Sequence, residues 1–201
     1  MHPFATDSPE RKNVTFTLAL VSVLATWGLN RLVQLFHIAI PWWVGAPSVL
    51  GVFYLLYEVF DKWCWHWPVW RKLGVVKLPD LDGKWDGCLS SSFDEHGKSY
   101  PIRVVVHQDW THISVLLETE QSESHSLTAS ILVQQAGGIS LSYQYHNDPK
   151  PVVNPRMQPH RGTAVVKLKA NGGLLEGEYY TGRGRQNYGT VRLWRTGDSR
   201  P

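Results

Sequence analysis

Two apolar runs near the start of the chain constrain its fold most. The first extends from Val14 to about Phe36 and the second from Trp42 to about Phe60. Each has close to the roughly 20 residues that a helix needs to cross a membrane. A cleaved signal peptide is the alternative for the first run, but its apolar core would be shorter and would end at a cleavage site. We expect residues 1–78 to form two transmembrane helices and an interfacial linker rich in aromatic and basic residues.

Lys and Arg residues beside these runs predict their orientation. Because cytoplasmic loops carry the excess of positive charge, both termini should be cytoplasmic. The short link near residues 37–41 has no Lys or Arg. The two cysteines, Cys64 and Cys88, form no disulfide framework, which agrees with a reduced compartment. The flanking positive residues are Arg11, Lys12, Lys62, Arg71, Lys72 and Lys77.

Polar residues inside the runs allow two interpretations. Arg31 lies near the outer end of the first run and Glu58 near the inner end of the second. In the first interpretation, each side chain extends to its nearer interface. In the second, Asn30, Arg31 and Gln34 form a membrane-active polar stripe, which becomes buried or water-lined only when several helical hairpins associate.

From residue 79 onward, apolar and polar side chains alternate with the period of two that half-buried strands require, as at Ile113, Val115 and Leu117. Turns rich in Gly, Asn and Asp separate these segments. The expected fold is a membrane α-helical hairpin plus an all-β domain over residues 79–201. Short links favour an antiparallel up-and-down β-barrel with room for one small ligand. About eight strands are expected, near residues 83–93, 100–108, 111–120, 124–135, 138–147, 162–169, 174–181 and 185–195.

Two local features bear on how such a barrel would be closed. The sequence Gly83-Lys84-Trp85 is similar to the opening of lipocalin and avidin barrels, in which the Trp plugs one end, so we expect Trp85 in the core. The connection Asn147–Arg161 contains four prolines and cannot be a central strand. It is either a rim or lid over the barrel mouth or a solvated connector.

Motifs that carry catalysis are not found in the sequence. It has neither the H-E-x-x-H zinc motif nor a G-x-S-x-G nucleophile turn. Asp80-Leu81-Asp82-Gly83 lacks the other ligands of a calcium loop, and Gly182-x-Gly184 joins two expected strands. We expect no enzyme activity, no catalytic residue, no metal site and no cofactor. The net charge is only +3. A DNA-binding protein would be expected to carry a basic stripe, so DNA is not an expected partner.

The segment Tyr179–Thr190 joins the last two expected strands and concentrates ligand-binding chemistry. Arg183 and Arg185 can each hold phosphate with a bidentate fork. Tyrosine rings can stack on bases, and Gln186 can contact a base edge. The mixture suits a nucleotide better than a fatty ligand. A solvated polar hairpin is the alternative.

The motifs together resemble a known family. The chain resembles the two-transmembrane β-barrel effectors of CBASS anti-phage systems. The features that carry the resemblance are the two N-terminal membrane helices and the motifs G-K-W-D-G (Gly83–Gly87), H-R-G-T-A (His160–Ala164) and Y-Y-T-G-R-G-R-Q (Tyr179–Gln186). The resemblance covers nearly the whole chain. It implies a cytosolic barrel that binds a cyclic dinucleotide made by a cGAS-like nucleotidyltransferase. Homo-oligomerisation, disruption of the bacterial inner membrane and death of the infected cell would follow.

Chemistry and placement, rather than the resemblance, select the expected ligand residues. Arginines would contact phosphate, tyrosines would stack on bases, and Thr or Gln would reach sugar or base edges. Alternation within the strand 174–181 favours Tyr179 and Thr181 as interior. The alternative function is a membrane-anchored lipocalin-like carrier or sensor of a small apolar ligand, and a tethered hydrolase lacks any recognisable nucleophile–base pair. The expected ligand residues are Tyr143, Tyr145, Arg161, Tyr179, Tyr180, Thr181, Arg183, Arg185 and Gln186.

Overall fold

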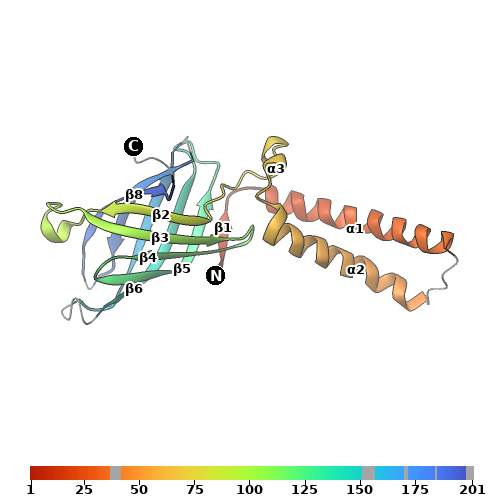
Figure 1. The fold of residues 1–201 in the computed structure, drawn as a ribbon, viewed down its shortest axis with the longest axis horizontal. Coiled ribbons are helices and arrows are strands. Elements are labelled where there is room, and N and C mark those ends of the chain that lie inside the picture. The colour runs from red at the N-terminus through yellow and green to blue at the C-terminus, as the bar shows by residue number, and fades with distance from the viewer. Residues whose placement is uncertain (37–41, 151–156, 170–171, 184, 198–201) are drawn as a thin grey trace. The chain divides into compact units, whose positions relative to one another are not determined.

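The chain forms two compact units in the computed structural model (Figure 1). Residues 8–77 form a helical unit, and residues 1–7 together with 78–201 form a β-barrel unit. The barrel unit thus includes the first seven residues of the chain, which lie before the helical unit in the sequence. The structure describes residues 1–36, 42–150, 157–169, 172–183 and 185–197, and the side chains of residues 42–47 lie outside the description.

The helical unit is a hairpin of α1 (Glu10–Leu35) and α2 (Trp42–Val59), which pack against each other. A π-helical turn, η1 (Phe60–Cys64), and the short helix α3 (Pro68–Lys72) follow. Glu10 lies in the first turn of α1, where a carboxylate interacts favourably with the helix dipole. Both expected helices are therefore present, within a few residues of their expected ends.

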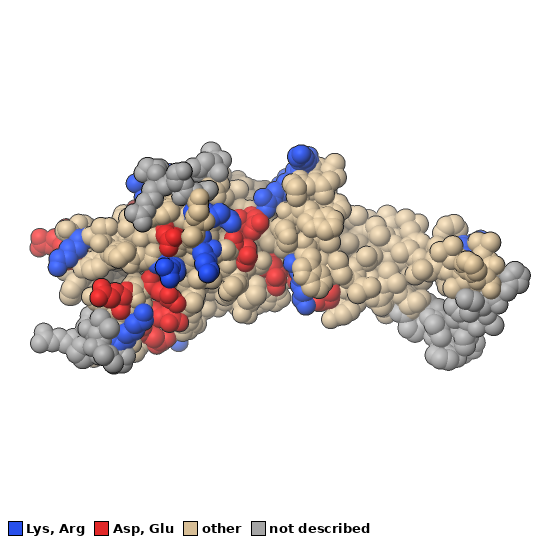
Figure 2. Space-filling view, viewed as in Figure 1, with Lys and Arg blue, Asp and Glu red and all other residues tan. Residues whose placement is uncertain are grey.

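Helix α1 has the surface of a membrane span. Among the described residues it is the one helix long and apolar enough to cross a bilayer, with a mean hydropathy of 1.5. Large apolar side chains such as Phe16, Leu24 and Trp27 are exposed, which water would disfavour and lipid would not. On the face drawn in Figure 2, the middle of the hairpin shows few charged side chains, whereas the barrel carries both signs.

The polar residues of the hairpin have specific surroundings. The Arg31 guanidinium lies over the Trp27 ring at 5.6 Å from its centroid. Glu58 forms an ion pair with Lys62 one turn later, at 3.0 Å. Asn30, Arg31 and Gln34 are all exposed on α1, so the polar stripe stays a prediction that depends on association of hairpins.

Over its described residues, the barrel unit is a closed sheet of nine strands. Eight of them form the expected antiparallel meander, in which each strand pairs with the next and the last pairs with the first of the eight. The eight are β2 (Gly83–Leu89), β3 (Tyr100–Gln108), β4 (His112–Glu118), β5 (Ser122–Leu132), β6 (Ser140–Pro149), β7 (His160–Leu168), β8 (Leu174–Thr181) and β9 (Tyr188–Arg195).

The ninth strand corrects the expectation of about eight. β1 (His2–Thr6) lies between β4 and β5, antiparallel to the first and parallel to the second. Five residues before an apolar run are too few to show a period of two. The strand forms because β4 and β5 diverge and leave a gap whose backbone groups need partners.

The expected strand over 83–93 is shorter in the structure because β2 ends at Leu89. The Ser91 hydroxyl accepts a hydrogen bond from the Phe93 N–H at 3.2 Å, which starts a 3₁₀ turn, η2 (Ser92–Asp94). Glu95 and His96 follow in the left-handed region, with φ of 56° and 61°. Local hydrogen bonding of Ser to the backbone competes with strand pairing here.

Trp85 lies in the barrel core, as expected, and is fully buried. Its indole N–H donates to the Leu81 carbonyl at 3.0 Å, and the Arg195 guanidinium covers the ring at 4.7 Å. Arg195 also donates to the Asp80 and Asp82 carbonyls, at 2.6 and 2.8 Å. The indole N–H of this buried ring is therefore satisfied within the barrel.

Candidate ligand-binding site

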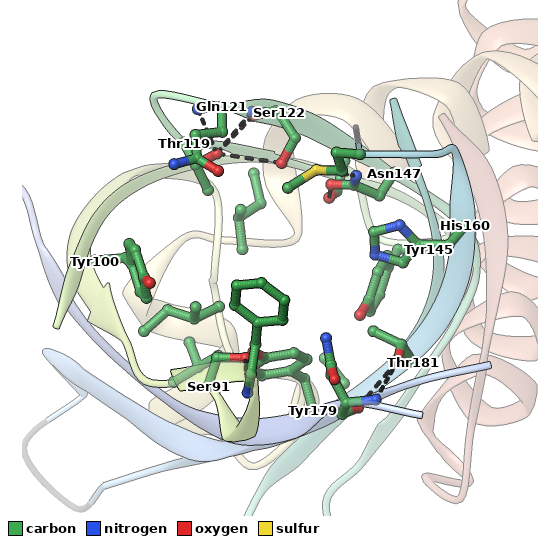
Figure 3. A pocket seen from close by; sticks show the side chains of 18 of the residues that line it. Ser91, Tyr100, Thr119, Gln121, Ser122, Tyr145, Asn147, His160, Tyr179 and Thr181 are labelled. Atoms are coloured by element: carbon green, nitrogen blue, oxygen red, sulfur yellow. Dashed lines mark hydrogen bonds between the residues drawn. The ribbon is translucent and has the colours of Figure 1, made fainter. Parts of the chain in front are cut away.

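The barrel contains a cavity of about 440 Å³. It lies at the end where β2 and β4 finish and β5 begins, away from the residues that surround Trp85. Figure 3 shows side chains from the strands and from the turns between them arranged around an open centre. The volume lies within the range of small-molecule sites.

Five aromatic side chains supply much of the lining. Tyr100 and Tyr145 lie on opposite sides of the open centre (Figure 3). Tyr143, Tyr145 and Tyr179 are at most 9% exposed, whereas Phe93 on the η2 turn is 71% exposed. Rings held in a rigid wall can stack on flat ligands with little loss of conformational entropy. The aromatic residues are Phe93, Tyr100, Tyr143, Tyr145 and Tyr179.

The lining tyrosines remain neutral at physiological pH. Burial raises the pKa of Tyr143 to about 12. Burial also raises the pKa of Tyr145 and of Tyr179, while Arg185 opposes the shift in both. Their hydroxyl groups therefore stay available as both hydrogen-bond donors and acceptors.

Positive groups outnumber acidic ones in the lining. Among the lining residues that the structure describes, Lys98 and Arg185 are cationic and Glu120 is the one acid. The Arg185 guanidinium lies 5.8 Å from the Phe93 ring centroid. With the Asn187 amide turned so that both of its groups are satisfied, its oxygen accepts from Arg185 Nε at 3.0 Å. Arg185 is thus held at the cavity by its neighbours, where it can pair with an anion.

His160 adds a group that is neutral at physiological pH. Burial lowers the pKa of this imidazole, and the charges of Arg185 and His146 lower it further, while a hydrogen bond to the Gln158 carbonyl opposes them. Met157, which precedes β7, also lines the cavity. The described part of the long Pro-rich connection therefore contributes to the rim, and residues 151–156 lie outside the described residues.

Two buried polar side chains are oriented by a hydrogen bond across β5 and β6. The Ser124 hydroxyl donates to Asn147 Oδ1 at 2.8 Å, and the two residues are direct partners in the ladder. Among the described residues, the acceptor that the structure gives Asn147 Nδ2 is the Met157 sulfur, at 3.8 Å. Since sulfur is a weak acceptor, this amide can donate to a bound molecule.

Of the nine expected ligand residues, five line the cavity: Tyr143, Tyr145, Tyr179, Thr181 and Arg185. The other four are exposed and do not line it: Arg161, Tyr180, Arg183 and Gln186. Alternation explains why Arg161 and Tyr180 point outward. Each comes directly after a residue that lines the cavity, His160 or Tyr179, and successive side chains of a strand point to opposite faces. Arg183 and Gln186 lie in the turn between β8 and β9, where Gln186 has φ of 52°. The ligand role of all nine stays a prediction.

Sequence reasoning missed Phe93, Lys98, Tyr100, Asn147 and His160. All five lie outside the segment Tyr179–Thr190, and closure of the barrel brings them to the cavity. Tyr100 and Asn147 carried a signal, since Tyr100 begins one alternating segment and Asn147 lies near the end of another. Lys98 carried none, because side chains of a turn have no period that predicts their direction, and Phe93 was expected at the end of a strand but lies in this turn.

Two glycines next to the cavity have a steric role. In H-R-G-T-A, a Cβ at Gly162 would overlap the Tyr145 hydroxyl, and Ala164 lines the cavity. A Cβ at Gly189 would lie 2.7 Å from Tyr179 Cε1. These glycines make the room in which two of the cavity tyrosines sit.

Comparison with known proteins agrees with this geometry. A family model described as the Cap15 cyclic dinucleotide receptor domain matches residues 76–195, and one described as the Cap15 TM helices matches residues 12–66. The chain is 34% identical to CD-NTase-associated protein 15 of Yersinia aleksiciae over 150 residues, which are 74% of this chain and 69% of that protein. It is 26% identical to the protein of the same name from Staphylococcus schleiferi over 134 residues, 67% of this chain and 69% of that one.

These matches confirm the expected resemblance, and they cover both structural units. The barrel that holds the cavity is the part that corresponds to the receptor domain. The hairpin of α1 and α2 is the part that corresponds to the TM helices. The chain therefore belongs to the Cap15 family, whose barrel domain is a cyclic dinucleotide receptor domain.

Proposed function

We propose that this chain is a non-enzymatic CBASS effector whose cytosolic barrel binds a cyclic dinucleotide. The nucleotide is the product of a cGAS-like nucleotidyltransferase, and its binding drives homo-oligomerisation and disruption of the inner membrane. The observation that carries the proposal is the cavity, which combines aromatic rings with two cationic groups in a domain of the receptor family. An apolar carrier would need neither cation.

The chemistry of the lining matches the parts of such a ligand. A cyclic dinucleotide has two phosphates, and Lys98 and Arg185 are cations that can pair with them. It has two bases, and Tyr100 and Tyr145 offer ring surfaces on opposite sides of the cavity (Figure 3). Asn147 is placed to donate to a base or sugar oxygen.

The membrane step is assigned to the helical hairpin. Helix α1 meets the requirements for a span, and α2 is taken as the returning span, so that both termini are cytoplasmic. Ligand binding can favour an assembled state only by having a higher affinity for that state. Assembly then brings the polar stripe Asn30, Arg31 and Gln34 of several α1 helices together within the bilayer.

The test is a binding and leakage experiment with the purified full-length chain. Calorimetric titration with cyclic di-GMP, cyclic di-AMP, cyclic GMP-AMP and cyclic di-UMP should give saturable binding of at least one of them. The same compound should release dye from liposomes that contain the chain. A folded chain that binds none of the four but binds a fluorescent fatty acid would replace this function with the apolar carrier.

A further inference from the structure

The N-terminal strand β1 fills a gap between two strands that line the ligand cavity. β4 and β5 pair directly only at residues 116–118 and 123–125. Beyond that point they diverge, and β1 lies between them. His2 and Pro3 pair with β4, while Phe4–Thr6 pair with β5.

Side-chain contacts hold β1 in this gap. Phe4 is 3% exposed and belongs to the barrel core. His2 Nε2 and the Ser126 hydroxyl are 2.8 Å apart, and the same hydroxyl accepts from the Val115 N–H at 2.9 Å. Ser126 therefore joins β1, β4 and β5 at the point where the sheet opens.

The residue that follows β1 is held equally firmly. The Asp7 carboxylate accepts hydrogen bonds from the N–H groups of Val133 and Gln134, at 2.7 and 3.0 Å. Gln134 Nε2 donates back to the Asp7 carbonyl at 2.9 Å. The first seven residues are thus attached to the two residues that follow β5 by charge-assisted bonds to their backbone, in addition to the strand pairing.

The other ends of β4 and β5 form part of the cavity. The turn between them, Thr119–Ser122, lines it together with Leu117 and Ser124. This turn is closed by bonds between Thr119 and Ser122 and appears at one side of the open centre in Figure 3. A ligand in the cavity therefore contacts the same two strands that hold β1 at their far ends.

Little chain separates β1 from the first membrane helix. β1 ends at Thr6 and α1 begins at Glu10. Since an extended residue spans at most about 3.6 Å, the three intervening residues allow little slack. Glu10 is 3% exposed, and its carboxylate accepts from the Ser8 hydroxyl at 3.1 Å and from the Lys77 N–H at 2.6 Å. Glu10, Ser8 and Lys77 all belong to the helical unit, so these bonds hold the start of α1 to the last residue of that unit.

We infer that β1 is the element through which ligand binding in the barrel acts on α1. The inference rests on the proposed function. A change in the β4–β5 hairpin alters the gap that holds β1, and the short, anchored link transmits that change to the start of the helix. The device requires that β1 be paired in the barrel and joined to α1 without slack.

Inserting Gly-Ser-Gly-Ser between Asp7 and Ser8 of the full-length chain adds slack and leaves every residue of β1 and of the cavity in place. We expect this variant to bind the tightest of the four cyclic dinucleotides within about twofold of the original chain, since the cavity is unchanged. Liposome leakage should need at least about tenfold more ligand, or be lost. The matched control is the same insertion between Gly137 and Gly138, an exposed turn of the barrel, which should leave both readouts unchanged.

Two results would overturn the inference. Full ligand-dependent leakage by the Asp7–Ser8 insertion variant would show that no taut link is needed. Loss of ligand binding in that variant, with binding kept in the Gly137–Gly138 control, would make β1 a support of the cavity instead of a transmitter. Failure of the proposed function is visible separately, as no ligand-dependent leakage from the original chain, and it would remove this inference as well.

Discussion

Gly162 lies directly opposite Tyr145 in the ladder between β6 and β7, and its missing side chain is what admits the Tyr145 hydroxyl. A Cβ at position 162 would overlap that hydroxyl and would also lie 2.6 Å from the Tyr180 carbonyl oxygen. The backbone oxygen cannot move aside as the far end of a flexible side chain could. The glycine therefore sets the position of a cavity tyrosine, although it does not line the cavity itself.

Replacing Gly162 with alanine should shift Tyr145 and weaken cyclic dinucleotide binding by about tenfold, which corresponds to about 1.4 kcal/mol. The melting temperature of the barrel should fall as well, since overpacking costs about 1–3 kcal/mol. Calorimetric titration and thermal unfolding measure the two effects. The control is Gly137→Ala, where the new Cβ meets only the end of the Lys167 side chain.

Arg185→Ala should abolish most of the affinity for a cyclic dinucleotide. Loss of a desolvated charge contact costs on the order of 2–5 kcal/mol, or roughly thirtyfold or more in the dissociation constant. Arg183→Ala is the matched variant, because Arg183 lies two residues away in the same turn but is exposed and does not line the cavity. Equal losses in the two variants would contradict the geometry of this turn.

Phe93→Ala should reduce affinity by roughly fivefold to a hundredfold, because stacking of one base on an aromatic ring contributes about 1–3 kcal/mol. Phe93 is 71% exposed, so its removal should leave the melting temperature nearly unchanged. Tyr180→Ala removes a ring of similar exposure on the outer face and serves as the control. Wild-type affinity in Phe93→Ala would exclude this ring from the site.

Tyr143 should make the barrel less stable at alkaline pH. Its pKa is raised from 10.0 to about 12 on folding, so the folded state holds this proton more tightly than the unfolded state. The stabilisation is complete below pH 10 and is lost as the pH rises towards 12, a change of roughly 2 kcal/mol. Urea unfolding at pH 9 and pH 12 measures this effect. Between the two pH values, the free energy of unfolding of Tyr143→Phe should fall by roughly 2 kcal/mol less than that of the original chain. Tyr180→Phe should behave like the original.

Much of the barrel could be predicted because strand periodicity is local information. Alternation of the kind seen at Ile113, Val115 and Leu117 located all eight strands of the meander, and the Gly-x-Trp sequence correctly placed Trp85 in the core. The same alternation placed Tyr179 inside and Tyr180 outside. Only some of the residues that line the cavity could be predicted. The composition of the sequence pointed to the turn between β8 and β9, whereas several strands and turns contribute to the cavity.

The sequence by itself determined the two-part organisation, since the apolar length of α1 and the period of two in the barrel are properties of consecutive residues. Only the tertiary structure decided which charges face the cavity: Arg185 does and Arg183 does not, although both lie in one turn. It also decided that His2–Thr6 becomes a strand, because a segment this short pairs only where two other strands diverge to receive it. The physical reason for the position of Arg185 and for the strand His2–Thr6 is the same: closure of the sheet brings together residues that are far apart in the chain.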